Sequence, residues 1–203
     1  MRIVICGQKE FGARVFDATR AAGHEVLAVF APVAGAGVDR LAERAEAAGV
    51  PLFGRVRPEA IPEGADVLVC AHAHDFVSRA ARERARLGAI GYHPSLLPLH
   101  RGKDAIRWAI KMGDRVTGGT VYQLTDEVDA GPILAQEFCF IRPGDTPAGL
   151  WRRELQGIGV RLLLRALHGL EAGEAVPRAQ DEAIATWEPS WEREPLASGA
   201  RAE

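Results

Sequence analysis

The feature that most constrains the fold is a series of short, mainly apolar runs separated by segments of helical periodicity. Strands that are buried on both faces show continuous apolar runs of this kind, whereas half-exposed strands alternate apolar and polar residues. The runs therefore predict neighbouring parallel strands with helices on their faces. They lie at residues 3–6, 25–30, 50–53, 66–70 and 88–92.

Two β-rich stretches in the second half of the chain extend the expected sheet. Residues 117–125 and 131–141 are rich in β-branched and aromatic side chains and flank a turn, which predicts a hairpin-like antiparallel pair. We therefore predict an α/β, Rossmann-like fold, with a mostly parallel central sheet flanked by helices and one antiparallel return strand. Helical periodicity is found at residues 38–49, 76–86, 103–112 and 147–170.

Length and composition indicate one domain with a tail. The chain has 203 residues, 47% of them hydrophobic, which is enough to bury one good core. From residue 171 onward the periodicity is lost. We expect residues 171–203 to pack on the domain as a C-terminal tail, through Trp187 and Trp191, and to fray at the end.

Charge and apolar content exclude several classes of partner. A net charge of −2 leaves no basic footprint, so no nucleic-acid partner is expected. No apolar run approaches the length of a membrane span, and residues 1–6 have the character of a strand rather than of a signal peptide. Cys6, Cys70 and Cys139 lack paired spacing, so we expect free thiols buried in strands and a cytoplasmic protein.

Two titratable residues stand where strand-like runs end. His93 closes an apolar run and is followed by Pro94, whose φ is fixed, while Asp129 lies where a second run breaks into a turn. Open α/β sheets place their chemistry at strand ends, and a His with a carboxylate nearby can move protons near neutral pH. The spacing alone is equally compatible with purely structural roles, in which His93 closes a loop and Asp129 stabilises a turn.

A longer motif surrounds these two residues. Residues 93–98 read His-Pro-Ser-Leu-Leu-Pro, Arg101-Gly102 follow, and residues 126–131 read Asp-Glu-Val-Asp-Ala-Gly. This combination resembles the folate-dependent formyltransferase family, which includes glycinamide ribonucleotide and methionyl-tRNA formyltransferases. With the preceding Tyr, the following His and the start of the chain at residues 7–12, it is most similar to the hydrolase domain of 10-formyltetrahydrofolate dehydrogenase. The resemblance covers roughly residues 1–170 and implies that they form the catalytic domain.

The resemblance also implies a reaction centre and a folate pocket. His93 would stabilise a tetrahedral oxyanion and relay protons, and Asp129 would orient His93 and stabilise its charge. The implied co-substrate is 10-formyltetrahydrofolate, with no metal. The implied binding residues are His72, Ala73, His74, Asp75, Phe76, Val77, Asp126 and Val128.

One position departs from the family pattern. Most members carry Asn two residues before the catalytic His, and this chain has Gly91 there. Glycine has no side chain that could donate a hydrogen bond to an oxyanion. The hydrolase domain of the dehydrogenase also lacks that Asn, so formyl chemistry remains compatible, whereas efficient transfer to an amine is placed in doubt.

Two other patterns allow more than one interpretation. His72 and His74 could suggest a metal site, but alternate residues of an extended segment point to opposite faces and no third ligand is evident. Solvent-exposed loop histidines are a further alternative to the folate pocket. The glycine turn at residues 7–12 could bind an anion at a helix N-terminus, but a tight strand-to-helix turn is favoured, because Lys9 replaces the second glycine of the dinucleotide pattern.

Three functions follow from the resemblance. The first is N-formyl transfer from 10-formyltetrahydrofolate to an amine of a small molecule, and the second is hydrolysis to formate and tetrahydrofolate. The third, a non-catalytic folate-binding protein, is disfavoured because both His93 and Asp129 are present. The expected partners are a small-molecule acceptor or water, and neither nucleic acid nor membrane. A homodimer is the assembly we consider.

Overall fold

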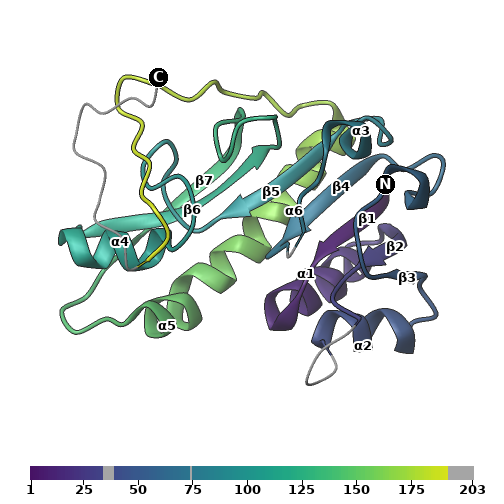
Figure 1. The fold of residues 1–203 in the computed structure, drawn as a ribbon, viewed down its shortest axis with the longest axis horizontal. Helices are drawn as coiled ribbons and strands as arrows, with labels where there is room; N and C mark the ends of the chain where they lie inside the picture. Colours follow the sequence, from purple (N-terminus) through teal and green to yellow (C-terminus); the bar gives the residue numbers. More distant parts are fainter. Residues whose placement is uncertain (34–38, 74, 192–203) are drawn as a thin grey trace.

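A seven-stranded sheet forms the centre of the molecule (Figure 1). The computed structural model describes residues 1–33, 39–73 and 75–191. The strand order is β3-β2-β1-β4-β5-β6-β7, in which only β6 runs antiparallel to its neighbours. The predicted fold class and the single return strand are therefore confirmed. The strands are β1 (Arg2–Gly7), β2 (Glu25–Phe30), β3 (Leu52–Phe53), β4 (Val67–Ala71), β5 (Ala89–His93), β6 (Val116–Gln123) and β7 (Ile133–Phe140).

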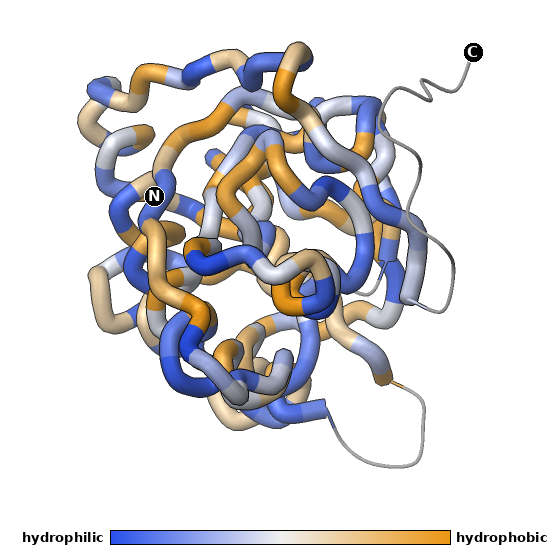
Figure 2. The backbone as a smooth tube through the Cα atoms, turned by 90° about the vertical axis from the view of Figure 1, so that its left-hand side faces the viewer, coloured by the Kyte–Doolittle hydropathy of each residue, from blue (hydrophilic) through white to orange (hydrophobic). Residues whose placement is uncertain are grey.

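Helices cover both faces of this sheet. Along β1, Ile3 and Ile5 point to one apolar cluster while Val4 and Cys6 point to another, as the two-residue period of a strand requires. The tube in Figure 2 shows short orange, apolar stretches between blue, polar ones, as expected of buried strands joined by polar segments. The main helices are α1 (Lys9–Ala21), α2 (Arg40–Ala47), α3 (Arg79–Arg82), α4 (Ala105–Met112), α5 (Pro147–Leu150) and α6 (Gln156–Ala172).

The larger apolar cluster joins the sheet to α1, α2 and α6. It includes Phe16 of α1, Leu41 of α2 and Leu162 of α6, all essentially inaccessible to solvent. Burying one such side chain contributes roughly 1.5–3 kcal/mol to folding. The smaller cluster, on the other face, contains Val77 and Ala81 from the α3 region. Both clusters hold the strands in fixed positions, and the strand ends carry the residues discussed below.

The helix predicted at residues 76–86 is wrong in its extent, because α3 covers only Arg79–Arg82. The hydroxyl of Ser78 accepts a hydrogen bond from the Ala81 N–H and so begins the helix after residue 78. At the other end, the N–H groups of Arg86 and Leu87 donate to the carbonyls of residues 65 and 66 instead of continuing the helix. Tertiary backbone pairing thus overrides the local periodicity. Residue 38, the first of the helix predicted at 38–49, lies outside the described residues.

Residues 173–191, here called the C-terminal segment, run along the molecule from the end of α6 to α4 (Figure 1). Arg178 pairs with Ile133 of β7, and Trp187 forms a bridge with Arg101. Further on, the Trp191 ring packs edge-on against Trp108, with centroids 5.2 Å apart. The segment therefore contacts both the β7 edge and the loop that follows β5. Within the described residues, no helix is both long and apolar enough to cross a bilayer.

Candidate active site

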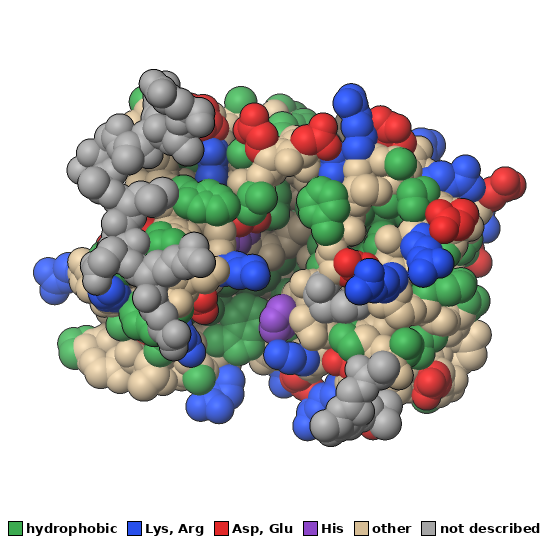
Figure 3. Space-filling model, viewed as in Figure 1, with side chains coloured by type: hydrophobic (Ala, Val, Ile, Leu, Met, Phe, Trp, Pro, Cys, Tyr) green, Lys and Arg blue, Asp and Glu red, His purple; other side chains and the backbone are tan. Residues whose placement is uncertain are grey.

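A cavity of about 870 Å³ opens where β1, β4 and β5 end. Figure 3 shows it as a hollow in the middle of the displayed face. Its walls come from the segment after β4, the end of β5, residues 102–107 and the turn between β6 and β7. Most of the residues singled out from the sequence line this hollow.

His93 is the last residue of β5 and is almost fully buried. Its Nε2 lies 2.7 Å from the carbonyl oxygen of His100. Because a carbonyl can only accept, Nε2 must carry a proton. The other ring nitrogen, Nδ1, lies 3.5 Å from Oδ2 of Asp129. In the neutral ring, Nδ1 is therefore the free base, and protonation there creates an ion pair with Asp129.

Asp129 lies in the turn between β6 and β7 with φ of 53°, a left-handed conformation that is uncommon for any residue except glycine. The Gly102 N–H donates to Oδ2 at 2.8 Å, and the Tyr122 hydroxyl donates to Oδ1 at 2.6 Å. The Asp129 backbone carbonyl accepts from the side-chain amide of Gln180 at 2.8 Å. Side chain and backbone are thus held from three separate segments.

His100 supports the loop between His93 and Asp129. Its ring lies between Asp114, 2.7 Å from Nε2, and Glu188, 3.2 Å from Nδ1. Burial alone would lower the pKa of His100, but the close carboxylates of Glu188 and Asp114 outweigh it and the pKa is raised. Its backbone N–H donates to the hydroxyl of Thr186. The C-terminal segment therefore fixes the carbonyl that orients His93.

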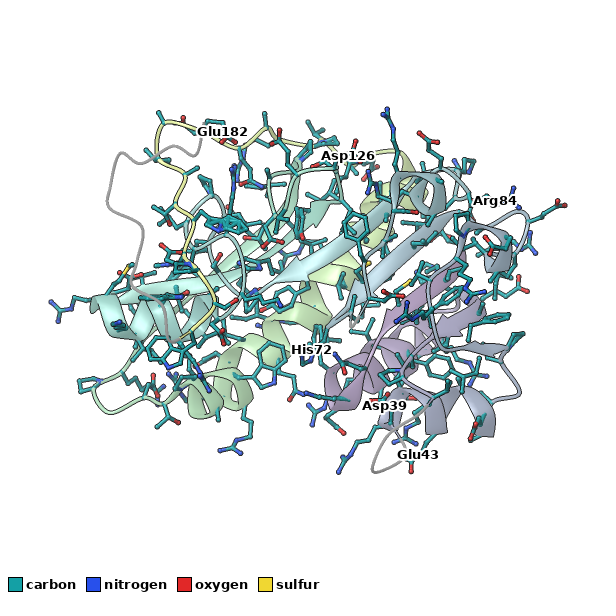
Figure 4. All side chains as sticks on the ribbon, viewed as in Figure 1. Asp39, Glu43, His72, Arg84, Asp126 and Glu182 are labelled. Carbon is teal, nitrogen blue, oxygen red and sulfur yellow. The ribbon has the colours of Figure 1, made fainter. Side chains whose placement is uncertain are left out.

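The segment after β4 forms the opposite wall. His72 and Ala73 are exposed, His74 lies outside the described residues, and the carboxylate of Asp75 accepts from the Val56 and Phe76 N–H groups. Figure 4 labels His72 at this side of the cavity. The Phe76 side chain is 70% exposed. Val77 is buried in the smaller apolar cluster, so it anchors this wall as well as lining it.

Asp126 and Val128 lie at the rim rather than beside the imidazole. Asp126 is largely exposed and pairs with Arg82 and Arg79. Arg82 itself is buried and also donates to the Val77 carbonyl. It therefore ties the segment after β4 to the turn that carries Asp129. Val128 is more than half exposed at the same turn.

Comparison with known proteins identifies the family. The model of the formyl transferase family matches residues 1–167. The chain belongs to the formyl transferase family. It is 37% identical to the cytosolic 10-formyltetrahydrofolate dehydrogenase of Mus musculus over 93% of this chain, but it spans only 22% of that relative's length. It is 34% identical to the methionyl-tRNA formyltransferase of Acidobacterium capsulatum, over 96% of this chain and 67% of the relative.

Solved structures agree with this assignment. The glycinamide ribonucleotide transformylase 1 of Symbiobacterium toebii superposes with a TM-score of 0.74 at 27% identity, covering 89% of this chain and 94% of that one. An N-formyltransferase of Helicobacter canadensis, with a TM-score of 0.75 at 15% identity, covers 91% of this chain and 69% of that one, and shares the fold. The family resemblance expected from the His-Pro-Ser-Leu-Leu-Pro motif is confirmed.

Around Gly91, where the sequence departs from the family pattern, there is little empty space. A Cβ atom at Gly91 would lie 2.9 Å from Cδ1 of Leu124 and within 3.6 Å of the Tyr122 ring and hydroxyl. The backbone at residue 91 is thus covered by side chains from β6 and the residue that follows it. The sequence pattern did not point to Tyr122, which alternation along a strand does not distinguish from an ordinary core aromatic.

The three cysteines of the chain are free and buried, as expected. Cys6 on β1 and Cys70 on β4 lie opposite each other in the strand pairing. The neighbouring Cys70, together with burial, raises the pKa of the Cys6 thiol. Among the described residues, which exclude His74, no group of three or more His, Cys, Asp or Glu is placed to hold a metal ion.

Proposed function

We propose that this chain transfers the formyl group of 10-formyltetrahydrofolate to an amine of a small molecule. The observation that carries the proposal is the pair of His93 and Asp129, whose Nδ1 and Oδ2 atoms lie 3.5 Å apart in a large cavity. The family supports the reaction class, and the names of the dehydrogenase relatives support the co-substrate.

The proposed reaction passes through a tetrahedral intermediate. Neutral His93 takes the proton that the amine nitrogen loses as it attacks the formyl carbon, and the imidazolium so formed stabilises the oxyanion on the former carbonyl oxygen. Asp129 stabilises the imidazolium while it exists. When the intermediate collapses, the bond between the formyl carbon and N10 of the folate breaks, and His93 delivers the proton to N10. The products are a formamide and tetrahydrofolate.

The proposed folate wall is the segment from His72 to Val77, with Asp126 and Val128 at the rim. The exposed aromatic ring of Phe76 and the nearby backbone groups suit a flat pterin with hydrogen-bonding edges. The acceptor would then enter from the other side of His93, past Gln8 and Ile106.

Hydrolysis is the alternative, and Gly91 favours it. A missing donor weakens stabilisation of the oxyanion, and relatives from Mus musculus and Homo sapiens are named 10-formyltetrahydrofolate dehydrogenases. In this alternative, water attacks in place of the amine and formate is released. A non-catalytic folate-binding role is disfavoured, because the hydrogen bonds around His93 and Asp129 hold a proton-transfer geometry that binding alone does not need.

We also propose that the protein acts in the cytoplasm without a membrane or nucleic-acid partner. The mouse relative is named as cytosolic, and the chain carries a net charge of −2.

The test is to incubate the purified chain with 10-formyltetrahydrofolate, with and without a panel of amines, while following tetrahydrofolate and formate. Tetrahydrofolate that appears only with an amine supports transfer, and equal amounts of formate and tetrahydrofolate without amine support hydrolysis. A chelator arm should leave the rate unchanged. The proposal fails if wild-type protein releases no more tetrahydrofolate than His93→Ala under every condition.

A further inference from the structure

Tyr122 lies directly opposite Gly91, where β5 and β6 pair. A Cβ atom at position 91 would lie 3.5 Å from Cε1 of Tyr122 and 3.6 Å from its hydroxyl oxygen. The hydroxyl therefore lies beside the space into which an asparagine side chain at residue 91 would extend. A polar group from β6 is present beside the position where most family members carry one on β5.

The local structure aims this hydroxyl at Asp129. The pairing of β6 with β7 shifts register between Val121 and Tyr122, and irregularities of this kind re-aim side chains next to active sites. The ring packs against Leu97 and Ile133, which limits its rotation. From there the hydroxyl donates to Oδ1 of Asp129 at 2.6 Å.

The two oxygens of Asp129 thereby have different partners. Oδ1 accepts from Tyr122, whereas Oδ2 accepts from the Gly102 N–H and faces Nδ1 of His93. Burial first, and then the charge of Asp129, raise the pKa of the Tyr122 hydroxyl well above its ordinary value. The phenol consequently keeps its proton and acts as a donor across the neutral pH range.

We propose that Tyr122 is a positioning residue for the formyl-group reaction, holding Asp129 in the rotation that turns Oδ2 toward His93. The inference rests on the proposed function, since it assigns Tyr122 a part in that reaction. It applies equally to transfer and to hydrolysis, because both use the same histidine and carboxylate.

The test combines Tyr122→Phe, which removes only the hydroxyl, with Asp129→Asn. Loss of a hydrogen bond to a charged group predicts a kcat lowered about 10- to 100-fold in Tyr122→Phe, with KM for 10-formyltetrahydrofolate changed by less than about 3-fold. In the Asp129→Asn background, the same substitution should lower kcat by less than about 3-fold, because the effect acts through Asp129. A tyrosine that only packs would instead lower kcat by the same factor in both backgrounds.

Thr146→Val is the control, since it also removes a single hydroxyl group and Thr146 does not line the cavity. The Thr146 hydroxyl accepts one hydrogen bond, from the Gly149 N–H at 3.1 Å, and this bond does not involve Asp129. We expect Thr146→Val to lower the melting temperature, because it removes the cap of α5, and to keep wild-type kcat. If Tyr122→Phe retains wild-type kcat in an active protein, the inference is overturned and the proposed function stands. An inactive wild type would overturn both.

Discussion

The two sides of the cavity differ in how they are held. On the side of His93 and Asp129, side-chain and backbone polar groups are bonded from β6, from the loop after β5 and from the C-terminal segment. On the other side, the described residues of the wall are anchored through Asp75, through the buried Val77 and through a hydrogen bond from Arg82 to the Val77 carbonyl, while the Phe76 side chain stays exposed.

This difference separates two tasks. Groups that stabilise charge in a transition state must be fixed before the substrate arrives, because reorganising them raises the barrier. A wall that contacts a flat ligand gains from exposed apolar surface that the ligand can cover. We therefore expect the tightly bonded side to carry the chemistry and the exposed side to supply affinity, so substitutions on the two sides should affect different kinetic constants.

The largest effect is expected at the reaction centre. His93→Ala and Asp129→Asn should each lower kcat by roughly 100- to 1,000-fold, because proton-transfer and oxyanion groups contribute about that much. KM for 10-formyltetrahydrofolate should change little, and circular dichroism should match the wild type. A large rise in KM with unchanged kcat would instead place these residues on the binding side.

A smaller loss is expected from Gln180, which joins two loops of the reaction centre. Its amide nitrogen donates to the carbonyls of residues 129 and 131, and its oxygen accepts from the Arg101 guanidinium. Gln180→Ala leaves these groups without their partner, so kcat should fall about 10-fold, as one or two lost hydrogen bonds imply. Arg178→Ala, on the same segment, is the control and should keep wild-type kcat. Equal kcat in both variants would show that the segment does not position Asp129.

The exposed wall should respond in KM alone. Phe76→Ala removes an aromatic ring that is 70% exposed, so stability should be unchanged while KM for 10-formyltetrahydrofolate rises about 3- to 10-fold from lost contact area. The control is Phe140→Ala, whose ring is 61% exposed on β7 and does not line the cavity. A change in kcat at Phe76 would blur the division between the two sides.

The fold could be predicted from the sequence because its signals are local. The apolar run at residues 3–6 and the β-rich stretch at 117–125 each carry their own pattern, and both are strands of the sheet. The prediction of a helix at 76–86 was wrong in extent because the deciding contacts are not local. The N–H groups of Arg86 and Leu87 donate to backbone carbonyls about 20 residues earlier in the chain, at residues 65 and 66.

The site could be predicted only in part. Strand ends and the family motif point to His93 and Asp129. Their contact could not be predicted from a local pattern, because the two residues lie far apart in the sequence. His100 is held by Asp114 and Glu188, and Gln180 reaches across from a stretch without periodicity. Such partners are set by tertiary packing, so neither the local pattern nor the short motif indicated them.

The smallest effect concerns pH and stability. Contacts to Glu188 and Asp114 raise the pKa of His100 on folding, so protonation favours the folded state. This contribution is fully present below the unfolded pKa of about 6.5 and is lost as pH rises through the higher folded pKa. The free energy of unfolding of the wild type should therefore exceed that of His100→Gln by a margin that becomes smaller between pH 6 and pH 9. A difference that grows with pH in urea titrations would contradict the ion-pair account.

The central claim is that His93 and Asp129 act as one unit on the formyl group. It is tested most directly by single-turnover release of tetrahydrofolate in His93→Ala, Asp129→Asn and the double variant. Groups acting as a unit are strongly non-additive, so the double variant should be no more than about 3-fold slower than the slower single variant. If the two losses multiply, the residues act independently, and Asp129 is then a turn residue with no part in orienting His93.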